Sequence, residues 1–138
     1  PETQVVLPRM KADLVECFLA CDNGTLSSDM VQWDDDWAVS VVLTSAGYPG
    51  SYEKGKIISG VDDANAMDGV TVYHAGTKLD ADGNVLTNGG RVLNVTAVAS
   101  TFEDARNLAY QACDKISFEG KTYRHDIGIK AIKGRSNL

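Results

Sequence analysis

The 138-residue sequence has no run of lysine and arginine and no long apolar segment. Its 13 basic residues are outnumbered by 19 acidic ones, so the formal net charge is −6 and the pI is near 4.7. A protein that binds nucleic acid or an anionic membrane surface needs a basic face that replaces condensed counterions. The composition therefore argues against both partners, and an anionic ligand would have to meet a few individually placed cations.

Cysteine and histidine are scarce too. The three cysteines are odd in number, and Cys17 and Cys21 lie one helical turn apart among apolar residues, where buried free thiols are common. His74 and His125 have no cysteine or histidine at the short spacing that a zinc site requires. We therefore expect no metal site, and reduced thiols without a signal peptide favour a cytoplasmic location.

Two segments have the periodicity of helices. Apolar residues recur every three or four positions over Val5–Cys21, and the Asp-Asn-Gly sequence that follows is a natural helix stop. Ser100 and Glu103 have the spacing of a capping box, in which each side chain satisfies a backbone N–H of the other's residue. The apolar residues beyond this box, up to Ile116, predict the buried face of a second helix.

The remaining apolar runs are short, rich in β-formers and separated by turn signals. The strand that begins at Arg91 is largely apolar on both faces and should be central, and the Asp82-Gly83 turn should close a hairpin. Residues 62–69 predict a loop or one helical turn, and residues 134–138 a frayed tail. With two helices, six or seven strands indicate an α+β domain whose sheet is largely antiparallel. The expected strands are Trp37–Thr44, Tyr52–Ser59, Val70–Leu79, Val85–Thr87, Arg91–Val98, Phe118–Tyr123 and Ile129–Ile132.

Two clusters of small residues interrupt the central strands: His-Ala-Gly-Thr at 74–77 and Thr-Asn-Gly-Gly-Arg at 87–91. Glycine inside a strand forfeits side-chain packing, so such clusters indicate that something approaches the backbone closely. A ligand is one candidate. The other is that the glycines only form a bulge or a tight bend, which the pattern alone favours.

The two clusters occur between a Gly-Tyr-Pro-Gly motif at 47–50 and a Tyr-Arg-His-Asp-Ile-Gly motif at 123–128. Together and in this order, the four motifs resemble the phosphoribosylamine–glycine ligase family, also called glycinamide ribonucleotide synthetase. The resemblance covers nearly the whole chain, although His125 stands where the family often carries lysine. It implies an ATP-dependent ligase of de novo purine biosynthesis, which joins glycine to 5-phosphoribosylamine and converts ATP to ADP and phosphate.

The resemblance also implies which part of the enzyme this chain is. Residues 1–30 would be the tail of the ATP-grasp region, and residues 31–138 the C-terminal substrate-pocket domain, with a barrel-sandwich-like arrangement of strands. The family's ligands for Mg²⁺ or Mn²⁺ lie just before an Asp-Pro-Glu-Thr-Gln segment, of which only residues 1–4 are present. We therefore expect a fragment of a longer protein, with no catalytic residue and no bound ATP or metal, inactive without its N-terminal and ATP-grasp lobes. The apolar stripe of its first helix should be exposed.

Arg91 and Arg124 are the candidate anion ligands, because a guanidinium presents a planar fork that matches a phosphate group. Backbone N–H groups in the glycine bends could reach the same anion. Surface arginines also pair with carboxylates, and His74 could equally be a structural histidine. The candidate substrate-binding residues are Gly47, Tyr48, Pro49, Gly50, His74, Gly76, Thr77, Gly89, Gly90, Arg91 and Arg124.

The alternative is a non-catalytic binding, carrier or docking module, since small antiparallel domains also serve such roles. A carrier would present a modifiable lysine at a hairpin tip. Lys78 lies near the Asp82-Gly83 turn but lacks the flanking methionines of the biotinyl motif.

Overall fold

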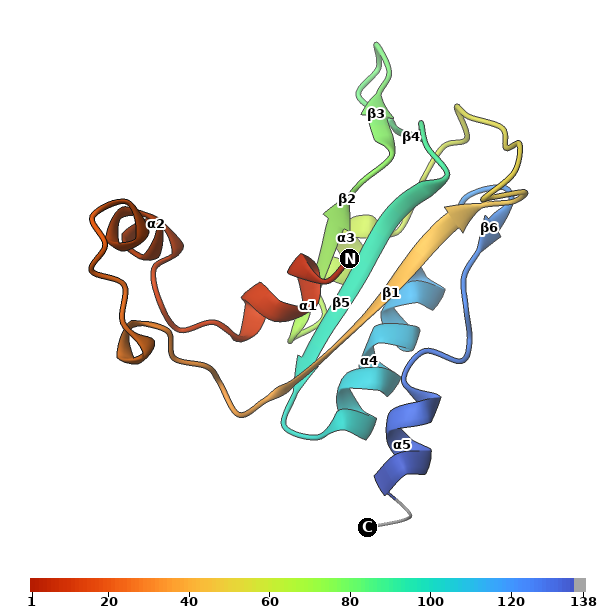
Figure 1. The fold of residues 1–138 in the computed structure, drawn as a ribbon. Coiled ribbons are helices and arrows are strands. Elements are labelled where there is room, and N and C mark those ends of the chain that lie inside the picture. Colours follow the sequence, from red (N-terminus) through yellow and green to blue (C-terminus); the bar gives the residue numbers. More distant parts are fainter. Residues whose placement is uncertain (136–138) are drawn as a thin grey trace.

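A four-stranded antiparallel sheet, in the order β2-β5-β1-β6, forms the centre of the fold (Figure 1). The computed structural model describes residues 1–135. β5 pairs with β1 on one side and β2 on the other, which confirms its predicted central position. The strands of this sheet are β1 (Trp37–Ser45), β2 (Val70–His74), β5 (Arg91–Ala99) and β6 (Lys121–Thr122).

A separate hairpin extends beyond one end of the sheet (Figure 1). It consists of β3 (Thr77–Leu79) and β4 (Val85–Thr87), and the predicted turn joins them. The single run predicted over residues 70–79 is broken because the backbone N–H of Gly76 turns to the carbonyls of Arg91 and Val92. The α+β class and the antiparallel pairing are confirmed. The six strands nevertheless form two sheets, and the main sheet is open where a barrel-sandwich-like arrangement was expected.

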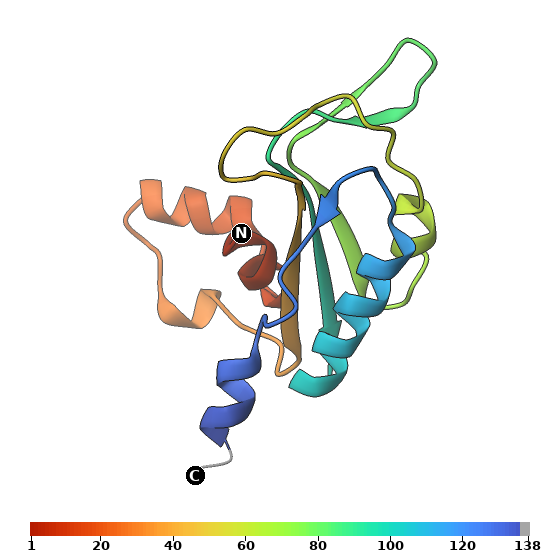
Figure 2. The same cartoon turned by 90° about the vertical axis from the view of Figure 1, so that its right-hand side faces the viewer.

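One face of the sheet packs against α4 (Phe102–Lys115), the helix predicted most directly by its periodicity (Figure 2). Alternate residues of β1 point to this side and are buried, as the two-residue period of a strand requires. Alanines on the facing side of α4 let its backbone approach the sheet. Burial raises the pKa of the Cys113 thiol to about 12, so this side chain is a protonated apolar group in the core. The fully buried core includes Val41, Leu43, Leu93, Val95, Ala105, Ala109, Ala112 and Cys113.

The N-terminal residues lie on the opposite side of the sheet from α4 (Figure 2). The single helix predicted over residues 5–21 is wrong, because two breaks divide it. Pro8 lies in a 3-10 turn, η1 (Leu7–Arg9), and Asp13 is extended and caps the next helix by accepting from the N–H groups of Val15 and Glu16. The helices on either side are α1 (Thr3–Val6) and α2 (Leu14–Asp22).

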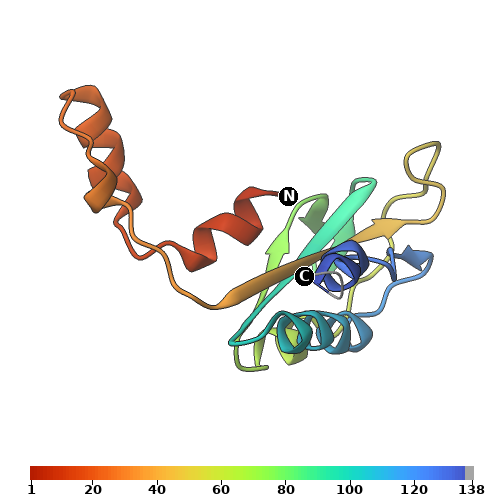
Figure 3. The same cartoon turned by 60° about the horizontal axis from the view of Figure 1, so that its bottom comes forward.

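α2 stands away from the sheet (Figure 3). It ends at Asp22 with Asn23 as its C-cap, and Gly24 has a φ of +66°, as predicted for the stop signal. Within the predicted apolar stripe of this helix, Phe18 is 62% exposed and Cys21 is exposed, but Leu14 is half-buried and Cys17 is buried, so the expected exposure is found only in part. The neighbouring Val15 and Leu19 are 64% and 57% exposed. A second 3-10 turn, η2 (Ser28–Met30), leads toward β1.

The C-terminal segment differs from its prediction. Ile129–Ile132 was expected to be a strand but belongs to α5 (Ile129–Arg135), whose first turn begins with the N–H of Ile129 donating to the carbonyl of Asp126. The four-residue segment Ile-Lys-Ala-Ile is too short for its pattern to distinguish strand from helix, which explains the error. Of the expected tail at 134–138, residues 136–138 lie outside the described part.

The segment between β1 and β2 was predicted to contain a strand and then a loop or helical turn, and these two predictions had different outcomes. The strand predicted over residues 52–59 is absent, and two isolated bridges, Ile57–Leu86 and Ser59–Ser117, stand in its place. Residues 62–69, predicted to be a loop or one helical turn, contain most of the short helix α3 (Val61–Asn65). Within residues 1–135, no helix has the length and apolar character needed to cross a membrane.

The cap of α4 lies one residue later than predicted. Thr101, not Ser100, is the N-cap, and its hydroxyl accepts a 3.1 Å hydrogen bond from the N–H of Asp104. We predict that Thr101→Ala lowers the free energy of unfolding by about 1 kcal/mol, because this N–H loses its partner. Urea unfolding measures the change. Ser100→Ala is the matched control, and an equal loss from it would contradict the assignment.

Candidate functional site

The two arginines selected from the sequence line one cavity of about 520 Å³. Arg91 begins β5 and Arg124 follows β6, two strands that flank β1. The cavity lies on the face of the sheet opposite α4, because the residues of β1 that line it alternate with those buried under that helix. Its lining consists of Pro1, Ser40, Val42, Thr44, Tyr48, Arg91, Thr122, Tyr123, Arg124 and Ile127.

A second cavity, of about 620 Å³, adjoins the first. Both are lined by Val42, Tyr48 and Arg91, so Arg91 lies between them. Residues 1–4 line this second cavity on its outer side. Among the described residues the guanidinium of Arg91 makes no hydrogen bond or ion pair, but its charge acts on the carboxylate of Glu2 in the same cavity. The pKa of Glu2 is lowered mainly by a hydrogen bond from its own backbone and, to a smaller extent, by Arg91. The fork of Arg91 is therefore available to an anion.

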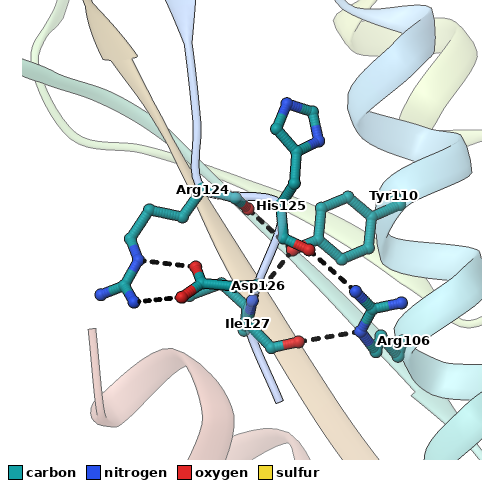
Figure 4. Close-up of polar contacts among 6 residues, drawn as sticks. All are labelled: Arg106, Tyr110, Arg124, His125, Asp126 and Ile127. Carbon is teal, nitrogen blue, oxygen red and sulfur yellow. Dashed lines mark hydrogen bonds and ion pairs between the residues drawn. The ribbon is translucent and has the colours of Figure 1, made fainter. Parts of the chain in front are cut away.

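Arg124 differs from Arg91 because an aspartate already occupies its fork (Figure 4). Its Nε and Nη2 donate to the two carboxylate oxygens of Asp126, at 2.8 and 2.7 Å. The hydrogen bond from Arg124 lowers the pKa of Asp126, and the same contact raises the pKa of Arg124. Both side chains are more than half exposed, and exposed ion pairs are weak, so a more highly charged anion can displace the carboxylate.

The glycines are approached closely by the protein itself. A Cβ at Gly90 would collide with the ring of Tyr48, and a Cβ at Gly76 would lie 2.7 Å from the Cα of Gly89. Ser45 ties the same bend to β1, because its N–H and hydroxyl donate to the carbonyls of Gly90 and Gly89 at 2.9 and 3.0 Å. The bends at 47–50, 76 and 89–90 therefore converge by packing, and the close approach that the glycines permit is made here by the protein's own atoms.

The other candidates lie outside the two cavities that Arg91 lines. Gly47 has a φ of +93° and forms the turn after β1, with Pro49 and Gly50 exposed beside it. The Nδ1 atom of His74 is 2.9 Å from the hydroxyl of Thr77. His74 lines a different cavity, of about 360 Å³, together with residues of α3. Of the eleven candidate residues, Tyr48, Gly90, Arg91 and Arg124 line the two cavities.

Asn94, which lines the second cavity from the middle of β5, was not among the residues selected from the sequence. Asn94 is 4% exposed, and its Oδ1 accepts from the hydroxyl of Ser40, which also contacts Thr96. Its Nδ2 has no hydrogen-bond partner among the described residues. Buried amide groups are normally paired. The signal available in the sequence was an amide on a strand whose other residues are mostly apolar.

The residues present fit an anion better than a metal ion. Across residues 1–135, no group of three or more His, Cys, Asp or Glu side chains has an arrangement that could hold a metal. Two guanidinium groups on one cavity suit a phosphate or carboxylate, which each fork can bind with two parallel hydrogen bonds.

Comparison with known proteins identifies the family. Residues 38–130 match the family described as "Phosphoribosylglycinamide synthetase, C domain". The chain belongs to this family. Members of the phosphoribosylglycinamide synthetase C-domain family share the α+β fold seen here: a crystal structure of phosphoribosylamine–glycine ligase from Thermotoga maritima matches with a TM-score of 0.75 at 38% identity, covering 92% of this chain and 30% of that one.

Two curated relatives show how much of a ligase this chain represents. It is 48% identical over 134 residues to a chloroplastic phosphoribosylamine–glycine ligase of Arabidopsis thaliana, and 48% identical over 132 residues to the ligase of Chlorobaculum tepidum. Each match covers 96% of this chain but only 25% and 31% of the relatives. The chain therefore spans a quarter to a third of their length. Because one relative is named as chloroplastic, the cytoplasmic expectation stays a prediction.

Asp126 should compete with an added anion for the fork of Arg124. We predict that Asp126→Asn tightens the binding of inorganic phosphate a few-fold, because the internal carboxylate no longer has to be displaced. Isothermal titration of the 138-residue chain measures the change. Asp82→Asn, in the distant hairpin turn, removes the same charge and should have little effect. Equal tightening by both variants would mean that only net charge matters.

Proposed function

We propose that this chain is the C-terminal part of a phosphoribosylamine–glycine ligase. Such an enzyme joins glycine to 5-phosphoribosylamine in de novo purine biosynthesis and converts ATP to ADP and phosphate. In this proposal the chain supplies one wall of the substrate pocket, where Arg91 and Arg124 face the phosphate of phosphoribosylamine. The observation that carries the proposal is that these two arginines, 33 positions apart in sequence, line one cavity on the face of the sheet opposite α4.

The two arginines that line the cavity support a phosphate as the ligand, although the net charge of the chain does not. The chain as a whole is acidic, so its overall field repels an anion, and binding must come from local contacts. A phosphate can accept paired hydrogen bonds from the free fork of Arg91 and, after displacing Asp126, from that of Arg124. Arginine is better suited than lysine to this task, since its donors are fixed in one plane.

The position of residues 1–4 supports a division of labour within the ligase. These residues line the cavity beside Arg91. The family resemblance places the ligands for Mg²⁺ or Mn²⁺ just before this segment, so ATP and its metal would be held by preceding parts of the enzyme. Residues 1–30 would then be the end of the ATP-grasp region and residues 31–138 the substrate-pocket domain. The missing lobes would be the chain's partners, together with phosphoribosylamine, glycine and ATP.

The carrier alternative gains no support from the hairpin. Lys78 lies within β3 and pairs with Leu86, whereas the turn is formed by residues 80–84. A modifiable lysine at the tip would have to stand in that turn.

We predict that the isolated chain does not turn over ATP, glycine and phosphoribosylamine, because the family resemblance places the ligands of ATP and its metal in preceding parts of the enzyme. A chimaera in which this chain replaces the matched segment of the Chlorobaculum tepidum ligase should be active. Release of ADP measures both reactions. Turnover by the isolated chain, or an inactive chimaera that is folded and binds ATP, would contradict the proposal.

The same chimaera tests the role of Arg91. Arg91→Lys keeps the charge and removes the fork, so it should raise KM for phosphoribosylamine more than KM for glycine or ATP. An equal rise in all three values would indicate a general defect.

A further inference from the structure

The loop that carries Arg124 is fixed to α4 by two side chains of that helix (Figure 4). The hydroxyl of Tyr110 donates to the carbonyl of Arg124 at 2.7 Å and accepts from the N–H of Ile127 at 3.2 Å. Arg106 donates through Nε to the carbonyl of Ile127 at 2.8 Å and through Nη2 to the carbonyl of His125 at 2.9 Å. These four hydrogen bonds hold the backbone from residue 124 to residue 127.

The two side chains form a unit. Arg106 and Tyr110 are four residues apart on α4, which places them on the same side of the helix. The guanidinium of Arg106 lies 4.7 Å from the centre of the Tyr110 ring, a cation–π contact that orients both groups. The helix beneath them is anchored in the core, so the unit connects a rigid element to the loop.

The loop has few backbone hydrogen bonds of its own. β6 ends at Thr122 and α5 begins at Ile129, so residues 123–128 belong to neither element. The carbonyl of Arg124 faces Tyr110, while its guanidinium extends the other way to Asp126 (Figure 4). The position of the backbone at residue 124 therefore determines the direction in which the Arg124 side chain extends from the loop.

We propose that Tyr110 is a positioning residue for anion binding. Through the backbone of Arg124 it holds that guanidinium at the cavity which Arg91 also lines. This inference rests on the proposed function, because it assumes that Arg124 binds the substrate's anion. Tyr110 does not line the cavity and acts only through Arg124.

The hydroxyl is the essential group because it is donor and acceptor at once. In Tyr110→Phe the ring can keep its contacts with Arg106 and His125, but the carbonyl of Arg124 and the N–H of Ile127 lose their partner. The loop should then sample other conformations, in which Arg124 no longer lines the cavity that it shares with Arg91.

The test is a double-mutant cycle in the 138-residue chain, with inorganic phosphate as the probe. Tyr110→Phe should weaken phosphate binding by about threefold or more when Arg124 is present, and should have no further effect in an Arg124→Ala background. Thr101→Ala is the matched control, since it destabilises the same helix without touching the loop. Urea unfolding of each variant provides the stability for comparison.

Three results would overturn the inference: no weakening by Tyr110→Phe, the same weakening with and without Arg124, or equal weakening by Thr101→Ala. A separate measurement distinguishes this inference from the proposed function. Hydrogen exchange at the Ile127 amide should accelerate in Tyr110→Phe, and an unchanged rate would refute the positioning role. If the unsubstituted chain does not bind phosphate, the proposed anion site is refuted. Faster hydrogen exchange at the Ile127 amide in Tyr110→Phe would still show that Tyr110 fixes the loop.

Discussion

The site depends on close contact between backbone segments that have no side chain to separate them. Gly76 meets Gly89 at a distance that leaves no room for a methyl group, and the ring of Tyr48 covers Gly90. Because Gly90 directly precedes Arg91, this packing determines where β5 begins and where its first side chain points. The loop after β1 and the bend before β5 are thereby held together beside the cavity.

The two faces of the sheet differ in their side chains. Its α4 side is apolar and contains the core, whereas its other side carries Ser40, Asn94 and Thr96, which are linked by hydrogen bonds. Arg91, at the start of β5, and Arg124, in the loop after β6, line the cavity on that second side. α4 nevertheless contributes to the site, because Arg106 and Tyr110 reach from it to the loop that carries Arg124.

The sequence predicted elements whose pattern is local and regular. β1 and β5 are unbroken runs rich in β-formers, α4 has a regular apolar period, and all three were placed to within one residue. The helix expected over residues 5–21 was not continuous, since the proline and the capping aspartate outweighed its apolar spacing. Ile129–Ile132 was too short for its period to decide between strand and helix.

The candidate site was predicted in part. Arg91 and Arg124 were selected through their motifs, and the fold brings them to one cavity. The contact between His74 and Thr77 and the pair of Arg124 with Asp126 are local, but nothing in the sequence distinguishes them from solvated side chains. The hydrogen bond of Tyr110 to the loop is a tertiary contact without a sequence pattern. Asn94 had a weak signal, an amide within a strand, but its unpaired Nδ2 becomes evident only from the burial around it.

The most direct test of the packing account is to place a methyl group at residue 90. With Gly90→Ala, the free energy of unfolding and the affinity for inorganic phosphate would be measured on the same sample. Since the new Cβ displaces the Tyr48 ring, unfolding should become easier by about 1–3 kcal/mol and phosphate binding should weaken together with it. An alanine variant with unchanged stability and unchanged phosphate affinity would contradict the account.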